Sequence, residues 1–163
     1  MDTVSISVEV NYNIPESELR EDLKLWGHIF IPYAQPPRNE SVGSGQHKVS
    51  FMIWWEDEAQ TFDRVKSFIE GTGCRHTTQV EMRSLALALL GGHRHSGTIG
   101  PDYSSPFLCF GTVWTLPSER VSAVPLLMIP SFTLNAGNVE WDLPMAEGVF
   151  PSKWNYVGVD KAG

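Results

Sequence analysis

The stretch that decides the fold is VSFMIWW at residues 49–55, which runs directly into EDEAQTFDRVKSFIE at residues 56–70. The first part is short, mostly apolar and ends in two aromatics, which predicts a buried strand. The second part predicts an amphipathic helix, because apolar side chains recur at steps of three and four residues: Ala59, Phe62, Val65 and Ile69, widened by Phe68. The acidic residues 56–58 suit a helix N-terminus, and Gly71 suits a helix end. We therefore expect a strand and a helix packed together, with Phe62 and Val65 buried against the sheet that contains Phe51 and Ile53.

Similar patterns extend this unit through the N-terminal half. Residues 4–12 alternate between apolar and polar side chains, which predicts a half-buried strand, and residues 15–26 read as a helix that begins at Pro15. Residues 74–82 favour a strand because Thr77, Thr78 and Val80 are β-branched. Residues 84–90 are either a short helix capped by Ser84 or a continuation of that strand. The order β-α-β-α-β is compatible with a ferredoxin-like N-terminal half or with a small mixed sheet.

The C-terminal half is rich in predicted strands and in prolines. Strands are expected within residues 107–116, 124–135 and 139–143, and Ala136-Gly137-Asn138 is expected to turn a hairpin between the last two. The apolar tail, residues 150–159, is expected to dock on the body of the protein. The sequence thus predicts one α+β domain over residues 1–163, with a mixed or antiparallel sheet, two or three helices and a β-rich C-terminal half.

The charge balance narrows the classes of partner. Lys and Arg number 12 against 19 Asp and Glu, so the formal net charge is −7. A field of that sign repels phosphate backbones, which argues against nucleic-acid binding, and it favours a basic protein partner or serves solubility alone. The chain has two cysteines, shows no signal peptide, and its longest apolar run, residues 85–90, is too short to cross a bilayer. We expect a soluble cytoplasmic protein that does not bind membranes.

One group of residues offers candidate chemistry. Cys74, His76, His93 and His95 carry the donor atoms that zinc prefers, and side chains two apart on a strand face the same way. Arg75 and Arg94 lie beside these histidines and suit an anionic ligand instead. A third interpretation is an ordinary set of loop histidines. Zinc motifs usually space their ligands by two to four residues rather than one, so we expect the four side chains not to converge.

These observations favour a non-enzymatic protein-binding module, such as an inhibitor, an immunity-type protein or an assembly subunit. It would need no cofactor, and exposed aromatics would anchor the partner. Candidate anchors in the long loops and the tail are Tyr33, Tyr103, Trp154 and Tyr156. The alternative is a small metal- or anion-dependent hydrolase that uses the Cys74/His76/His93/His95 group with zinc. No phosphate-binding loop, dinucleotide fingerprint or nucleophile elbow occurs in the sequence.

Overall fold

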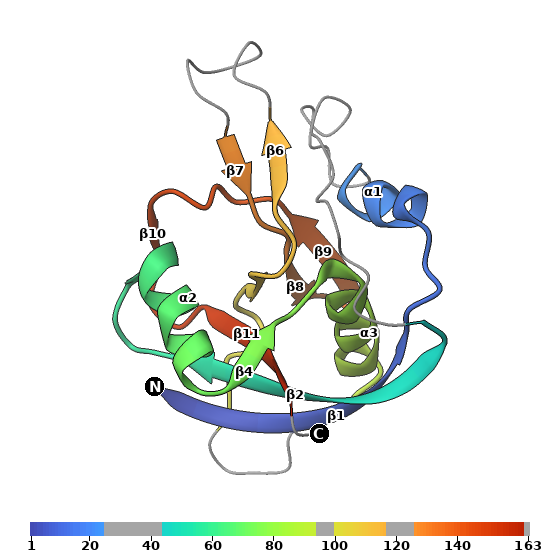
Figure 1. Ribbon diagram of the computed structural model, residues 1–163, viewed down its shortest axis with the longest axis horizontal. Coiled ribbons are helices and arrows are strands. Elements are labelled where there is room, and N and C mark those ends of the chain that lie inside the picture. The colour runs from blue at the N-terminus through green and yellow to red at the C-terminus, as the bar shows by residue number, and fades with distance from the viewer. Residues whose placement is uncertain (25–43, 94–99, 117–125, 162–163) are drawn as a thin grey trace.

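The computed structural model describes residues 1–24, 44–93, 100–116 and 126–161, which fold as an α+β domain (Figure 1). The described helices are α1 (Glu16–Lys24), α2 (Phe62–Gly71) and α3 (Gln79–Leu90). The strands before residue 100 are β1 (Asp2–Asn11), β2 (Gln46–Trp55), β3 (Gln60–Thr61) and β4 (Cys74–His76). Those after it are β5 (Phe107–Cys109), β6 (Trp114–Leu116), β7 (Leu126–Met128), β8 (Ser131–Asn135), β9 (Asn138–Asp142), β10 (Val149–Phe150) and β11 (Asn155–Asp160).

Both halves of the chain contribute strands to one seven-stranded sheet, and β6 pairs with β7 in a separate two-stranded sheet of the C-terminal half. The strand order of the seven-stranded sheet is β1-β2-β11-β5-β8-β9. The seventh strand, β4, pairs with β11 on the same side as β5. β11 is antiparallel to β2 and β4 and parallel to β5, which makes the sheet mixed. β2, α2 and β4 therefore form a split β-α-β unit of the ferredoxin-like kind, with β11 between its two strands.

α3 packs on one face of the sheet, where the long antiparallel pair of β1 and β2 curves beneath it (Figure 1). The side chains of α3 that face the sheet are Met82, Leu85, Ala86 and Leu89, all buried. They pack in one cluster with alternate residues of β1 and β2, among them Ile6, Phe51 and Ile53. The predicted alternation of β1 is thus confirmed, since its apolar side faces this cluster and its polar side faces outward.

α2 covers the opposite face of the sheet. Val65 and Ile69 of α2 are buried against Trp54, Cys74 and Tyr156, in a second apolar cluster. The prediction that Phe62 and Val65 are buried against the sheet that contains Phe51 and Ile53 is therefore confirmed for Val65, which packs on the face of that sheet that carries Trp54, opposite to the face of Phe51 and Ile53. Phe62 itself is half-buried, with its ring centroid 5.1 Å from that of Phe110.

The helix boundaries differ from the predicted ones because capping residues decide them. α2 begins at Phe62 rather than Glu56: Thr61 Oγ1 accepts a hydrogen bond from the Arg64 amide, and Ala59 lies exposed before the helix. α3 begins at Gln79, so the predicted strand over residues 74–82 stops at His76. Ser84 is inside α3 and is not its cap; Thr78 and Glu81 form a capping box instead.

The C-terminal half confirms the expected hairpin and the docked tail. Ala136 and Gly137 join β8 to β9 with φ values of 50° and 80°, as a two-residue type I′ turn requires. The predicted runs 107–116 and 124–135 each divide into two strands, and the run 124–135 divides at Pro130. The tail supplies β11 at the middle of the sheet rather than an added edge. In the described residues, none of the helices is long and apolar enough to cross a membrane.

Candidate functional site

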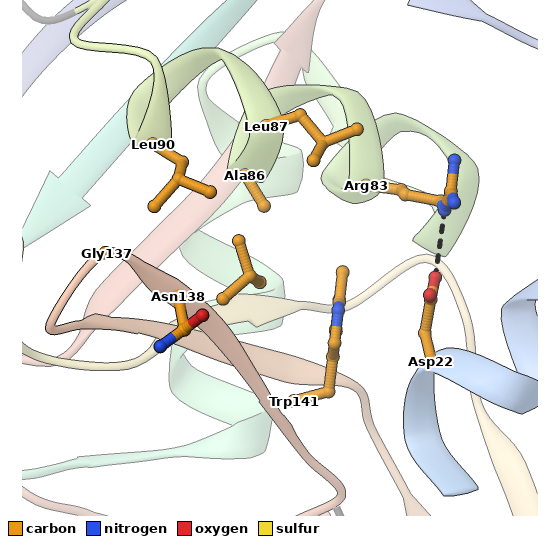
Figure 2. A pocket seen from close by; sticks show the side chains of 9 residues that line it. Asp22, Arg83, Ala86, Leu87, Leu90, Gly137, Asn138 and Trp141 are labelled. Carbon is orange, nitrogen blue, oxygen red and sulfur yellow. Dashed lines mark hydrogen bonds and ion pairs between the residues drawn. The ribbon is translucent and has the colours of Figure 1, made fainter. Parts of the chain in front are cut away.

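A groove runs between α3 and the β8–β9 hairpin, and α1 closes one end of it (Figure 2). Its cavity volume is about 260 Å³. One wall is the α3 surface, the other is the start of β9, and an ion pair between α1 and α3 forms the closed end. The lining residues are Asp22, Arg83, Ala86, Leu87, Leu90, Gly137, Asn138, Val139 and Trp141.

The wall contributed by α3 is a second stripe on that helix, apolar except for Arg83. Arg83, Ala86, Leu87 and Leu90 follow one another at i, i+3, i+4 and i+7, so they share a face. Leu87 is 54% exposed and Leu90 36% exposed, although each is adjacent in sequence to a residue of the buried stripe. A single exposed leucine is ordinary, but two beside a cavity make a continuous apolar surface, as interaction sites do.

The opposite wall depends on the hairpin turn. Positive φ at Ala136 and Gly137 folds β9 back so that Val139 and Trp141 face the groove. Trp141 is buried and packs its ring against Phe132 with a centroid separation of 5.6 Å, so its position is fixed by the core. Asn138 places a carboxamide at the mouth of the groove (Figure 2).

Three charges meet at the closed end of the groove. Arg83 donates a hydrogen bond from Nε to Asp22 Oδ2 at 3.0 Å, and its Nη2 lies 3.6 Å from Glu18 Oε2. Two carboxylates therefore share one guanidinium. Burial raises the pKa of the Asp22 carboxyl, and the nearby Glu18 carboxylate raises it further. The Arg83 guanidinium lowers the pKa by a smaller amount, so the pKa of Asp22 lies above its ordinary value. Of these three charged residues, Asp22 and Arg83 line the groove, where they pair with each other.

The predicted metal ligands do not come together where they are described. Cys74 and His76 both face α2, because residues two apart on a strand point to the same side. Cys74 is buried there, and His76 Nε2 lies 3.0 Å from Glu70 Oε1. His93 lies at the far end of α3, beyond about 18 Å of helix. Within the ranges that the structure describes, no three His, Cys, Asp or Glu side chains are placed to hold a metal. His95 lies outside those ranges, as does Arg94 of the predicted anion site.

The Arg75 guanidinium is paired with a carboxylate of the protein itself. It points to the α3 side of β4, where Nη1 donates to Glu81 Oε1 at 2.8 Å and Nη2 to Oε2. Tyr12 Oη donates to the same carboxylate at 2.7 Å. Burial would raise the pKa of Glu81, but the hydrogen bonds from Arg75, Thr78 and Tyr12 hold it below its ordinary value. Arg75 therefore serves a buried structural network.

The predicted aromatic anchors are placed unequally. Tyr156 is 1% exposed, because β11 lies at the middle of the sheet, so its ring is not at the surface. Trp154 is half-buried and stacks on Phe150 at 5.9 Å, and Tyr103 is half-buried beside Phe107. Tyr33 lies outside the described residues.

Sequence reasoning missed the groove. The available sequence signal is the wide apolar surface of α3: residues 82, 85, 86 and 89 form one apolar stripe, and the leucines at 87 and 90 lie beside it. Comparisons of the chain with protein-family models, with curated proteins and with solved structures give no match.

Proposed function

We propose that this protein is a non-enzymatic protein-binding module, and that the groove between α3 and β9 is part of its contact surface. The observation that carries the proposal is the pair of exposed leucines, Leu87 and Leu90, beside a cavity whose other wall is fixed by the buried Trp141. Contact surfaces between proteins combine such a rigid apolar hollow with a polar rim.

The size of the cavity favours a protein over a small molecule. About 260 Å³ lies below the roughly 300–1,000 Å³ of typical ligand and cofactor sites. A space of this size suits an anchor side chain of a partner. The net charge of −7 speeds encounter with a partner of opposite sign, so the partner is expected to be basic.

The test compares capture of partners by the wild-type protein and by Leu87→Ser/Leu90→Ser. A basic protein should be recovered from the native cell by the wild type, more at low salt than at high salt, and its affinity for the purified double variant should fall by at least about tenfold. Isothermal titration calorimetry with the purified pair gives that number.

The matched control is Val149→Ser, which removes another exposed apolar side chain, 64% exposed, from β10 on the side away from α3 (Figure 1). It should leave the affinity unchanged. Equal loss in both variants, recovery of nucleic acid, or no partner at any salt concentration would contradict the proposal.

A further inference from the structure

We infer that β1 pairs with β1 of a second copy of this chain, so that the sheet continues from one copy into the other. The two strands run antiparallel about a two-fold axis that passes beside Ile6. This surface is separate from the groove of the proposed function, and neither proposal depends on the other.

β1 is the end strand of the sheet and has one edge without a strand beside it. It pairs with β2 over ten residues in an unbroken register, and no other strand of the described ranges pairs with it (Figure 1). Soluble proteins protect such edges with lysine, proline, a bulge or a short length. β1 contains no lysine, proline or bulge, and its two charged residues, Asp2 and Glu9, lie near its ends. The middle of this edge is therefore suited to pairing with another strand.

The hydrogen-bond pattern shows which backbone groups point to the open edge. The Tyr12 amide donates to the Gly45 carbonyl at 2.8 Å, in register with the pairs between β1 and β2. Backbone groups alternate in direction along a strand, so the even-numbered residues of β1 bond to β2. The amides and carbonyls of residues 3, 5, 7 and 9 therefore point away from β2, toward the open edge.

This row of residues is complementary to itself. With a two-fold axis beside Ile6, Ser5 of each copy lies opposite Ser7 of the other, and Thr3 lies opposite Glu9, as hydrogen-bonded pairs. On the face toward α3, the buried apolar residues 4, 6 and 8 meet one another. Apolar residues thus lie opposite apolar ones, polar opposite polar, and no carboxylate lies opposite another carboxylate.

The flank of α3 beside this edge also fits a second copy. Ser84 Oγ accepts a hydrogen bond from the Asn11 amide at 3.4 Å, and that amide points away from β2, so this flank of α3 lies at the open edge. Val80 and Ala88 are one turn to either side of Ser84, and all three are half-buried. The two-fold axis makes the same flank of both α3 helices face each other, and these short side chains allow close approach. The pairing therefore covers a partly apolar flank together with the backbone edge.

The experiment measures self-association of the full chain by sedimentation velocity, from micromolar to millimolar protein. The wild type should shift from one chain toward two as the concentration rises, as a weak dimer, because a contact through one strand edge is smaller than a standard interface. High salt should favour the dimer, because it screens the repulsion between two chains of net charge −7. Binding of a basic partner has the opposite salt dependence.

Charge variants assign the contact to β1. Ser5→Lys/Ser7→Lys and Ser5→Glu/Ser7→Glu each place like charges in two directly opposed pairs, so each should weaken the dimer by about tenfold. An equimolar mixture of the two variants should dimerise at least as well as the wild type, because each lysine then faces a glutamate. The control Ser67→Lys/Ser152→Lys makes the same charge change at exposed positions on α2 and before β11, and it should not weaken the dimer.

Four results would overturn the inference. They are a single chain at every concentration and salt, a dimer that neither double variant of β1 weakens, a mixture that associates no better than each variant alone, and an equal loss in the control. The capture of a partner by the wild type and its loss in Leu87→Ser/Leu90→Ser are measured separately, so failure of one proposal leaves the other standing.

Discussion

The two helices that cover the sheet differ in how much apolar surface they carry. α2 has one buried stripe, centred on Val65 and Ile69, and its outer side is charged, with Arg64 and Lys66 exposed. α3 has a buried stripe on the other face of the sheet and then a second apolar stripe that is partly exposed. One stripe is enough to attach a helix to a sheet, as α2 demonstrates. The second stripe of α3 therefore points to a role outside the fold.

The largest expected effect separates the two stripes of α3. Leu85→Ala removes a fully buried side chain and should lower the free energy of unfolding by about 3–5 kcal/mol, whereas Leu87→Ala should change it by no more than about 0.5 kcal/mol. Urea unfolding of both variants, followed by tryptophan fluorescence, measures the difference. Similar losses at the two positions would mean that the second stripe supports the fold and would weaken the comparison with α2.

The second-largest expected effect on stability concerns one carboxylate on each face of the sheet. Glu81, on the α3 side, is buried and bound by Arg75, while Glu70, on the α2 side, pairs with His76 at an exposed position. Glu81→Gln should cost about 2 kcal/mol, below the range for fully buried pairs because water can reach Arg75. Glu70→Gln should have no measurable effect on the thermal midpoint. A larger loss for Glu70→Gln would show that the α2 face depends on its ion pair.

The same carboxylate makes a prediction about pH. The pKa of Glu81 is held below its ordinary value of 4.5, so its contribution to stability is present above that pH and is lost as pH falls toward the lowered pKa. The difference in stability between wild type and Glu81→Gln should therefore shrink below about pH 4.5. Unfolding curves at pH 7, 5 and 3.5 test this, and a difference that stays constant would argue against the shifted pKa.

A smaller effect concerns the turn that forms the second wall of the groove beside α3. Ala136 adopts a φ of 50°, a region that alanine occupies at a cost and asparagine tolerates. Ala136→Asn creates the preferred Asn-Gly pair of a type I′ turn and should stabilise the protein by about 0.5–1 kcal/mol. Thermal unfolding measures the gain; destabilisation would mean that the methyl group of Ala136 has a packing role.

The smallest expected effect on stability belongs to Asp22. A carboxyl whose pKa is raised in the folded state favours folding below its unfolded pKa, so its charge costs stability at neutral pH. Asp22→Asn should therefore not lower the stability at pH 7 and should raise it by at most about 0.5 kcal/mol. Calorimetry at pH 7 measures this, and a clear loss would place Asp22 with Glu81 among the residues that hold the fold.

Local patterns predicted much of the secondary structure and little of the groove. The alternation in β1 and the Ala136-Gly137 turn are determined by neighbouring residues, and both were predictable. α3 was misread because β-branched Thr77 and Thr78 resemble a strand, although Thr78 and Glu81 have the spacing of a capping box. The groove joins residues of α1, α3 and β9 that are far apart in sequence, so no local pattern determines which of them meet.

The order of the strands has a consequence for how the chain is made. β11 lies between β2 on one side and β4 and β5 on the other, and of the strands described it is the last to leave the ribosome. Until it arrives, β2 and β5 have no shared neighbour, and their unpaired backbone groups can pair with other chains. Gly158 of β11 must then enter where a side chain would meet the ring of Trp54, 2.9 Å from an added Cβ. A premature stop before residue 155 would therefore release a chain prone to aggregation, and slow translation would lengthen the time for which β2 and β5 stay without β11.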